Sequence, residues 1–344
     1  MTSIDQDRVL VLGAGPAGLA AARELAGQGI GVVLAERAEK PGGLAGRLAC
    51  KATDRCARCG VCLVEDLLAS VLASPLVEFR AGCRLASLTE TPKGLEAVLI
   101  AGERSEAERM AGLIVAVGAE PTRPRPRSHY AYGLWPNIIT GLELEEMVRA
   151  EETIQRPSDG KWPNRLAFIQ CVGSRDRQGE QPGCSQICCA YALRLADWIK
   201  SRRPETEVSI FYMDLQTVDR RPQGLLDDLA GRVKFIRALP GQVWPGDDDS
   251  LVLDFASPQS PTLQHCQVDL LVLSVGLAAS PGSAELAGLL GLERDQDGCL
   301  ISSQNRPLLV AGAATGPMGV AEAIRQGRLA GRQAAQWAGR DAGR

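Results

Sequence analysis

The sequence has no excess of charge, no apolar run long enough to span a membrane and no segment typical of secretion. Its net charge is −3, which gives no electrostatic argument for binding nucleic acid. The longest apolar stretches, such as 113–119 and 268–279, are shorter than the ~20 residues that a transmembrane helix needs. The first residues run directly into a strand pattern, without a basic and apolar signal segment. We therefore expect a cytoplasmic protein with no membrane span and no nucleic-acid partner.

Hydrolytic motifs are also missing. The sequence contains no GxSxG elbow and no HExxH motif, and its two histidines, His129 and His265, are isolated. The chemistry is therefore expected to come from bound cofactors. The 11 cysteines in a reducing compartment indicate metal binding or redox work rather than structural disulfides.

The N-terminal stretch has the pattern of a dinucleotide-binding site. Residues 9–12 form a buried-type strand, an alanine-rich helix follows to about residue 28, and the next strand, 30–35, ends at an acid. In this arrangement the glycines turn the chain and admit a pyrophosphate at the helix N-terminus, and the acid binds ribose hydroxyls. The residues expected to bind the cofactor here are Gly13, Gly15, Pro16, Ala17, Gly18 and Glu36.

Three later segments resemble those of the two-dinucleotide-binding flavoproteins of the disulfide-reductase type. A Gly-Gly turn follows the acid, the strand 113–117 leads to a glycine, and the strand 307–311 leads to another. The resemblance implies that the cofactor is FAD and that the Gly-Gly turn passes along its flavin side. The aspartate that usually follows the last glycine is missing, so a backbone amide or Thr315 is expected to contact the ribityl chain. The further FAD-binding residues implied are Arg37, Gly43, Gly118, Gly312, Thr315 and Gly316.

We therefore predict an α/β, thioredoxin-reductase-like fold with two Rossmann-type domains. A length of 344 residues suits two domains, each with its own core. We expect a discontinuous FAD-binding domain at 1–120 and 265–344, to which the buried-type strand 268–275 returns the chain. The second domain, 121–264, is expected to carry a loop that binds an iron–sulfur cluster.

That loop lies in a second strand–helix–strand pattern, with strands at 166–170 and 208–215. Four cysteines stand where a phosphate-binding turn would be expected: Cys171, Cys184, Cys188 and Cys189. Thiolates suit zinc or an iron–sulfur cluster, and the adjacent pair favours a cluster because zinc typically takes two spaced pairs. Thiols without metal are the alternative, either as a redox dithiol such as Cys184/Cys188 or as inert buried groups.

A second cysteine group follows the Gly-Gly turn and comprises Cys50, Cys56, Cys59 and Cys62. The CxxCxxC spacing is common in clusters, and Cys50 could complete the set. The fourth cysteine followed by proline of a full ferredoxin pattern is missing. A second cluster or metal site, redox-active thiols near the flavin and a structural role all stay open.

Four segments resemble the A subunit of heterodisulfide reductase: 130–148 (YAYGLWPNIITGLELEEMV), 157–176 (PSDGKWPNRLAFIQCVGSRD), 184–194 (CSQICCAYALR) and 311–319 (AGAATGPMG). The resemblance covers nearly the whole chain. It implies FAD in a thioredoxin-reductase-like fold and a homodimeric electron-transfer hub inside a larger complex. It also implies a [4Fe–4S] cluster bound by Cys171, Cys184, Cys188 and Cys189.

The chain departs from this family in three ways. It lacks the extra ferredoxin-like domains of the methanogen protein, and its length is similar to the short A subunit of the heterodisulfide-reductase-like complex of sulfur-oxidising bacteria. Arg194 stands where the family often has a lysine near the flavin N5. An arginine there stays charged and could stabilise an anionic reduced flavin, so Arg194 is the expected catalytic residue. Cys62 extends the family's CxxC at Cys56 and Cys59.

The expected function is an FAD- and [4Fe–4S]-containing oxidoreductase subunit that relays electrons between flavin and partner iron–sulfur subunits. NAD(H) is a candidate two-electron partner, and sulfur oxidation is a candidate setting. One alternative is a free-standing flavin disulfide reductase with a Cys56/Cys59 or Cys184/Cys188 dithiol, which would contain FAD without iron. The other is a non-catalytic assembly subunit, whose bound groups would resist reduction by physiological partners.

Overall fold

The computed structural model describes residues 8–92, 94–124, 130–176, 181–216, 221–258, 260–303 and 306–338, and at 221–223 the backbone alone. The chain forms two compact units. Unit 1 comprises Met1–Gly46, Gly60–Glu120 and Ala278–Arg344, and unit 2 comprises Arg47–Cys59 and Pro121–Leu277. The chain therefore passes between the units four times. Two of these passages lie in strands that pair with each other, β8 (Ala119–Pro121) and β17 (Leu277–Ala279).

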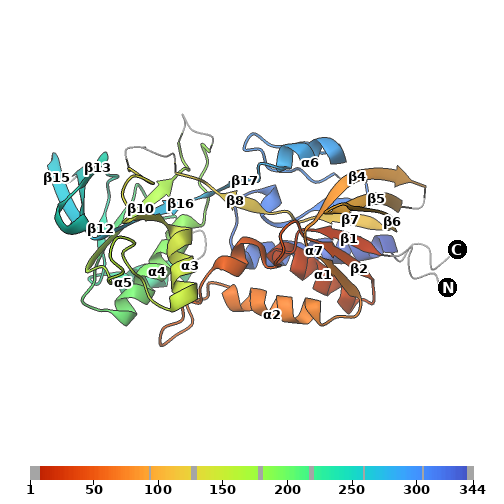
Figure 1. Cartoon of the computed structure of the whole chain (residues 1–344), viewed down its shortest axis with the longest axis horizontal. Coiled ribbons are helices and arrows are strands. Elements are labelled where there is room, and N and C mark those ends of the chain that lie inside the picture. Colours follow the sequence, from red (N-terminus) through yellow and green to blue (C-terminus); the bar gives the residue numbers. More distant parts are fainter. Residues whose placement is uncertain are drawn as a thin grey trace. The chain divides into compact units, whose positions relative to one another are not determined.

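Unit 1 is built on a parallel five-stranded sheet (Figure 1). Its strands in spatial order are β18 (Leu308–Val310), β7 (Gly112–Val115), β1 (Val9–Leu12), β2 (Val32–Ala35) and β3 (Val77–Arg80). All residues of β1 and β2 are buried, which explains why these strands read as continuous apolar runs rather than alternating ones.

Two long helices, α1 (Pro16–Gly27) and α7 (Val320–Ala338), pack closely in unit 1. A Cβ on Gly327 would lie 2.1 Å from the carbonyl oxygen of Ala17, and one on Gly331 would lie 2.9 Å from that of Ala21. Only glycine allows this approach, because any side chain would collide with the backbone of α1. The helix α2 (Val61–Leu72) also contacts α1.

A separate hydrophobic cluster joins the parallel sheet of unit 1 to an antiparallel meander and a short helix. Leu10 and Leu113 of the sheet pack with Leu95 and Leu99 of the meander in this cluster. The elements that complete unit 1 are β4 (Cys83–Thr91), β5 (Gly94–Ala101), β6 (Arg104–Met110), α6 (Ser283–Leu290) and the short 3-10 turns η2 (Gly43–Arg47) and η4 (Gly312–Thr315).

Unit 2 has its own parallel five-stranded sheet. The strands in spatial order are β12 (Lys234–Ile236), β11 (Glu207–Phe211), β10 (Arg165–Val172), β16 (Leu270–Val275) and β9 (Ile138–Thr140). Alternate residues of β10 enter two different cores. Leu166 and Phe168 pack in a cluster with the helices, whereas Ala167 and Ile169 pack in a cluster with the antiparallel strands.

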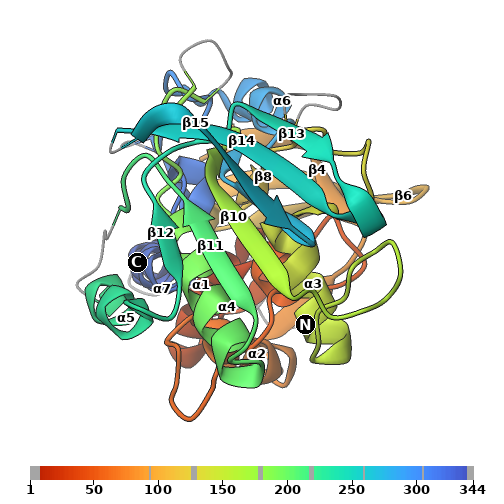
Figure 2. The ribbon, with the colours of Figure 1, turned by 90° about the vertical axis from the view of Figure 1, so that its left-hand side faces the viewer.

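The helices of unit 2 are α3 (Gly141–Glu151), α4 (Cys188–Arg202) and α5 (Arg221–Leu229). A capping box begins α3: the Thr140 hydroxyl accepts a hydrogen bond from the Glu143 N–H, and the Glu143 carboxylate accepts one from the Thr140 N–H. The other core is covered by the antiparallel strands β13 (Gln242–Pro245), β14 (Leu251–Ser257) and β15 (Ser260–Val268), which cross over β10 and β11 in Figure 2. The 3-10 turn η3 (Asp247–Asp249) joins β13 to β14.

The strand at 270–275 differs from our expectation. It pairs with β10 and β9 in the sheet of unit 2, and the chain enters unit 1 again only at Ala278. We expected this return at residue 265. A buried parallel strand is apolar throughout, so its sequence does not show which of two similar sheets it joins.

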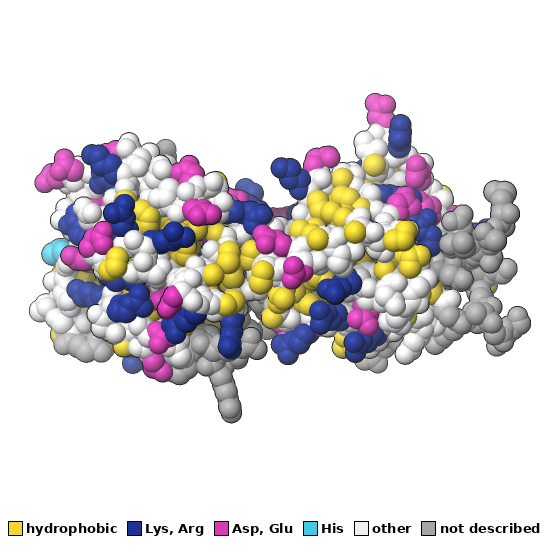
Figure 3. All heavy atoms as spheres, turned by 90° about the horizontal axis from the view of Figure 1, so that it is seen from below, with side chains coloured by type: hydrophobic (Ala, Val, Ile, Leu, Met, Phe, Trp, Pro, Cys, Tyr) yellow, Lys and Arg dark blue, Asp and Glu magenta, His cyan; other side chains and the backbone are white. Residues whose placement is uncertain are grey.

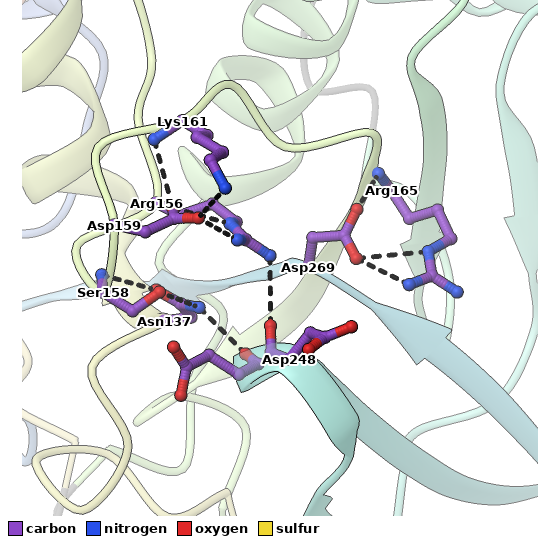
Figure 4. A network of polar contacts seen from close by, with 9 residues as sticks. Asn137, Arg156, Ser158, Asp159, Lys161, Arg165, Asp248 and Asp269 are labelled. Atoms are coloured by element: carbon purple, nitrogen blue, oxygen red, sulfur yellow. Dashed lines mark hydrogen bonds and ion pairs between the residues drawn. The ribbon is translucent and has the colours of Figure 1, made fainter.

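A polar network fixes the N-terminal end of β10 (Figure 4). The backbone N–H and the guanidinium of Arg165 donate to the Asp269 carboxylate, at 2.8 and 2.6 Å. Asn137 donates to the Ser158 hydroxyl at 3.0 Å and to the Asp249 carbonyl at 2.9 Å, and its own oxygen accepts from the Ser158 N–H at 3.0 Å. These bonds hold the loop that precedes β10 and thereby fix the strand whose other end leads into the cysteine loop.

The face drawn in Figure 3 carries described charged residues of both signs. On the face of each unit drawn in Figure 3, basic and acidic side chains are interspersed with apolar ones. Within the described ranges of the chain, no helix has both the length and the hydropathy needed to cross a bilayer.

Candidate functional site

The predicted dinucleotide turn lies between β1 and α1. Gly13 has a φ of +100°, and a Cβ on Gly18 would lie 1.8 Å from the Gly13 carbonyl oxygen, so both positions require glycine. Gly15 is different, because its φ is −81° and no atom lies within 4 Å of where its Cβ would be. The space beside Gly15, at the N-terminus of a 12-residue helix that begins with Pro16 and Ala17, fits a pyrophosphate approaching the backbone.

Glu36 lies at the C-terminal end of β2 and is 9% exposed. Its two carboxylate oxygens accept hydrogen bonds from the N–H groups of Ala14, at 2.8 Å, and Ala38, at 2.9 Å. This arrangement fixes the carboxylate beside the glycine turn. Each oxygen keeps lone pairs for the ribose hydroxyls that we expect it to bind.

The Gly-Gly turn contacts the same region. The Gly42 N–H donates to the Ala14 carbonyl at 2.8 Å, and a Cβ on Gly43 would lie 3.1 Å from the Gly15 Cα. The structure therefore brings Gly43 together with the first fingerprint, although 28 residues of sequence separate Gly43 from Gly15.

The remaining residues predicted to bind FAD also belong to unit 1. Gly312, with a φ of +70°, packs on α1: a Cβ there would lie 2.5 Å from the Ala17 Cβ. Thr315 donates its hydroxyl to the Gly312 carbonyl at 3.0 Å, while Gly118 and Gly316 have open space where a Cβ would be. Arg37 forms an ion pair with Glu120. Their roles as flavin contacts stay predictions.

In unit 2, three of the four predicted cluster ligands meet at the start of α4. Cys171 lies near the end of β10, and Cys188 and Cys189 are the first two residues of α4. All three thiols are buried, with exposed fractions of 8%, 1% and 4%. Cys184 is half-buried on the connecting loop, and its sulfur accepts a hydrogen bond from the Gln186 N–H at 3.3 Å.

The three buried thiols shift one another's pKa. Hydrogen bonds from Cys171 and Cys189 to the sulfur of Cys188 lower the pKa of Cys188 to about 3. The same bonds, together with burial, raise the pKa of Cys171 and of Cys189. The helix N-terminus also favours a thiolate at this position.

Backbone strain is concentrated beside these thiols. Cys171 has a φ of +62° and lies at an irregularity in the pairing of β10 with β16. Gly173 has a φ of +71°, and a Cβ there would lie 2.6 Å from the Thr122 hydroxyl. A non-glycine residue in this conformation costs on the order of 1–3 kcal/mol, and such residues cluster at functional sites.

A cation lies next to the same sulfurs. Arg175 donates to both carboxylate oxygens of Asp214, at 2.5 and 3.0 Å, and its charge opposes the rise in the pKa of Cys171. The ion pair fixes the cysteine loop to the segment that follows β11. Its charge favours an anionic group at the thiols.

Buried polar atoms without partners adjoin this group. Gln170 is 1% exposed, and neither atom of its side-chain amide has a hydrogen-bond partner among the residues that the structure describes; the same holds for the Ser174 hydroxyl, 4% exposed. Buried groups of this kind are normally satisfied. Soft donors, a nearby cation and unsatisfied polar atoms together fit an anionic, sulfur-rich group such as an iron–sulfur cluster. For a single metal ion, no group of three or more His, Cys, Asp or Glu side chains within the described ranges has a suitable arrangement.

The second cysteine group is arranged differently. Cys50, Cys56 and Cys62 are exposed and Cys59 is half-buried. Cys50, Cys56 and Cys59 belong to unit 2, while Cys62 belongs to α2 of unit 1. The four thiols are therefore not a set held by one unit, and a second cluster stays a prediction.

The segment 47–59 is fixed to unit 2 by a buried ion pair that the sequence did not reveal. Lys51 is buried, and so is Glu145 on α3; the Lys51 Nζ lies 2.6 Å from the Glu145 Oε2. Glu145 also accepts from the Ala49 N–H at 3.0 Å, and Lys51 donates to the Ala49 carbonyl at 2.8 Å. Neither residue lies in a recognisable motif, so only the fold brings them together.

Arg194 contacts this segment as well. Its guanidinium donates to the carbonyl oxygens of Ala57, at 3.0 Å, and Arg58, at 3.4 Å. Ala57 and Arg58 are the two residues between Cys56 and Cys59. Arg194 therefore ties the helix of the first cysteine group to the loop of the second, and its role as a charge beside the flavin stays a prediction.

His265 takes no part in either group. It lies on β15, and its Nδ1 is 2.6 Å from the carboxylate of Asp254. His129 lies outside the described residues.

Comparisons with known proteins agree with this fold. Residues 11–56 match the family model described as an NAD(P)-binding Rossmann-like domain. Thioredoxin reductase from Lactococcus lactis has a TM-score of 0.64 at 16% identity, covering 96% of this chain and 98% of that one. An NAD-dependent persulfide reductase from A. fulgidus has a TM-score of 0.58 at 15% identity, covering 95% of this chain and 59% of that one. The predicted fold class, a thioredoxin-reductase-like α/β flavoprotein fold, is confirmed.

Proteins with similar sequences indicate a more specific resemblance than the fold does. The A subunit of the H2:CoB-CoM heterodisulfide,ferredoxin reductase from Methanothermobacter thermautotrophicus is 35% identical over 238 residues, 65% of this chain and 36% of that protein. The iron-sulfur A subunit of the CoB–CoM heterodisulfide reductase from Methanocaldococcus jannaschii is 33% identical over 268 residues, 72% of this chain and 40% of that protein. The resemblance to the A subunit of heterodisulfide reductase is confirmed. The matched segments span well under half of each relative.

Proposed function

We propose that this chain is an electron-transfer subunit that binds FAD on unit 1 and an iron–sulfur cluster at the start of α4 in unit 2. The observation that carries the proposal is the burial of three cysteine side chains at that helix start, those of Cys171, Cys188 and Cys189. The M. jannaschii relative supports it, because that protein is named as an iron-sulfur subunit.

On unit 1, the residues that would hold FAD are those of the glycine turn and Glu36. The open space at Gly15 would admit the pyrophosphate, whose charge the N-terminus of α1 favours. A bound flavin would supply the exchange between two-electron and one-electron chemistry. NAD(H) is the two-electron partner that we propose for it.

On unit 2, Cys171, Cys184, Cys188 and Cys189 would hold the cluster. The protein's contribution is to keep water away from three of these sulfurs, since Cys171, Cys188 and Cys189 are all less than a tenth exposed. Arg175 would compensate negative charge at the site, and Arg194 would keep the Cys56–Cys59 loop in place on α4. A bound cluster would supply one-electron storage.

Iron, acid-labile sulfide and flavin assays on anaerobically purified protein, with electron paramagnetic resonance before and after dithionite, test the proposal. We expect one FAD and one four-iron cluster, and Cys188→Ser should abolish the iron while keeping the flavin. Cys266→Ser is the matched control, because Cys266 is a half-buried thiol on β15 of the same unit. Flavin without iron or sulfide in the wild-type protein would refute the cluster.

A second candidate function follows from the thiolate character of Cys188. A thiolate with a lowered pKa is the nucleophile of dithiol–disulfide exchange, and Cys184 and Cys188 would form the dithiol of a flavin disulfide reductase. This function predicts flavin, no iron, and loss of disulfide reduction in both Cys184→Ser and Cys188→Ser.

The proposal extends to partners. The relatives are named as subunits of heterodisulfide reductases, which supports partner subunits for this chain too. We further propose a cytoplasmic homodimer that works in sulfur oxidation, as the resemblance to the short A subunit implies. Light scattering of the purified protein tests the dimer, because a monomer mass would contradict it.

A further inference from the structure

The most unusual buried group outside the predicted ligands is the side chain of Gln170. It is 1% exposed, and within the described part of the chain both its amide nitrogen and its amide oxygen lack hydrogen-bond partners. Burying an amide without partners is costly, because the group gives up its bonds to water and gains none in return. A buried glutamine in this state indicates that a partner arrives with a bound group.

Gln170 lies where the regular pairing of β10 ends. The register of β10 against β16 shifts between Ile169 and Val172, and Cys171 in this interval has a φ of +62°. Gln170 therefore belongs to the same irregular stretch of backbone as Cys171 and directly precedes it in the chain.

The position along β10 places Gln170 at the cysteine end of α4. In a strand–helix–strand unit the helix begins near the C-terminal end of the preceding strand. Gln170 is two residues from the C-terminal end of β10, and Cys188 and Cys189 begin α4. The unsatisfied amide and the buried thiols therefore share one region of the core.

A second unpartnered group supports the same location. The Ser174 hydroxyl is 4% exposed and lacks a hydrogen-bond partner. A Cβ on Gly276, directly after β16, would lie 3.2 Å from the Ser174 Cβ and 2.7 Å from the Ser185 Cβ. The Ser185 hydroxyl, 2% exposed, likewise has no hydrogen-bond partner among the described residues. The end of the sheet is thus surrounded by polar side chains that adjoin the thiols.

We propose that Gln170 donates a hydrogen bond from its amide nitrogen to a sulfur of the group bound at Cys171, Cys184, Cys188 and Cys189, and thereby raises its reduction potential. The inference rests on the proposed function, because it names the residue that tunes the same site. A donor to a sulfur stabilises the form with more negative charge, which is the reduced form. Gln170 is a positioning and tuning residue and forms no bond to iron.

The experiment compares the wild-type protein with Gln170→Leu, using the full chain purified without oxygen. Iron and sulfide content is measured first. Potentiometric titration followed by electron paramagnetic resonance then gives the midpoint potential, and release of iron to a chelator gives the stability of the bound group. Urea unfolding of the iron-free protein gives the effect on the fold alone.

We expect Gln170→Leu to lower the midpoint potential and to release iron about 10-fold faster, the lower end of the effect typical of partners of metal ligands. The iron-free variant should be as stable as the iron-free wild-type protein or more stable, because an unsatisfied amide has been removed. Asn137→Leu is the matched control. Asn137 is also 1% exposed, but its amide is fully bonded to Ser158 and Asp249, so this variant should lose stability without changing the potential.

Each result decides the inference. An unchanged potential with a normal iron content would overturn the role of Gln170 and leave the proposed function intact. A wild-type protein without iron would overturn both, and the iron assay alone distinguishes this case. If Gln170→Leu is insoluble, Gln170→Met carries the same test with a side chain closer in shape, and it should lower the potential in the same direction.

Discussion

Two segments of this molecule have the same order of strand, turn and helix but differ in the residues of the turn. In unit 1, β1 leads through glycines into α1, and the turn leaves open space beside Gly15. In unit 2, β10 leads through a cysteine loop into α4, and the same position is filled by buried thiols and unsatisfied polar atoms. The turn of unit 1 leaves space for a ligand to approach the backbone. The turn of unit 2 instead presents the cysteine side chains that we propose as ligands.

The difference shows what a helix N-terminus supplies and what the turn must add. Both helices present free N–H groups and a partial positive charge, which favour anions. Glycines let a phosphate reach those N–H groups directly. At the second turn the cysteines offer thiols instead, of which Cys188 is the most acidic because its neighbours Cys171 and Cys189 lower its pKa.

The largest expected loss of stability comes from breaking the buried ion pair between Lys51 and Glu145, which holds the segment 47–59 to α3. Lys51→Met would leave the Glu145 carboxylate buried without its cation, which should cost about 3–5 kcal/mol of unfolding free energy. Chemical denaturation of the iron-free protein measures this loss. Arg47→Gln, which breaks the exposed ion pair with Glu146, is the control and should cost about 0–1 kcal/mol. Equal losses in both variants would show that burial does not distinguish the two pairs.

The next effect tests the glycine turn itself. Gly18→Ala places a Cβ 1.8 Å from the Gly13 carbonyl oxygen, so the turn must shift, at a cost of about 1–3 kcal/mol or more. Gly27→Ala in the same helix meets no atom within 4 Å and should stabilise the protein by about 0.5–1 kcal/mol. Thermal unfolding of the two variants should therefore move in opposite directions, and a harmless Gly18→Ala would contradict the close packing of this turn.

A third variant separates folding from binding. Gly15→Ala adds a methyl group in open space at an extended φ, so the flavin-free protein should keep its stability to within about 0.5 kcal/mol. The methyl group would occupy the space that we assign to the pyrophosphate, and FAD affinity should fall at least about 10-fold, or about 1.4 kcal/mol. Flavin fluorescence titration checks this. Undiminished FAD binding would place the cofactor elsewhere.

The smallest effect concerns the link between the two cysteine groups. Arg194→Gln removes the hydrogen bonds to Ala57 and Arg58 and should cost about 1 kcal/mol or less. The freed loop should expose Cys59, so its alkylation by a maleimide should become faster while that of Cys266 stays the same. Arg202→Gln at the other end of α4 is the control, and it should leave both rates unchanged.

The sequence was sufficient for the local parts of the fold and insufficient for the distant ones. The glycine spacing and the apolar run at 9–12 correctly predicted β1, its turn and α1, because the conformation of a glycine turn is dictated by its own residues. The helix α4 was predicted from a different local signal, the strand–helix–strand pattern around the cysteine loop. The location of the strand at 270–275 was not, since buried strands of both sheets have the same apolar composition.

The site was predictable to the same extent. Thiols are recognisable by residue type, so Cys171, Cys188 and Cys189 could be named in advance. Lys51 and Gln170 could not, because a lysine or glutamine is ordinarily exposed and only tertiary contacts reveal that these two are buried. The docking of 47–59 on unit 2 depends on Glu145, a partner 94 residues away.

The four passages of the chain between the units have a consequence for folding. Unit 1 is assembled from three separate stretches of the chain and unit 2 from two. The short stretch 47–59 ends just before Gly60, whose φ of +85° only glycine adopts easily. Neither unit can be completed until stretches far apart in the sequence have met, so we expect the rate of folding to be limited by these distant contacts.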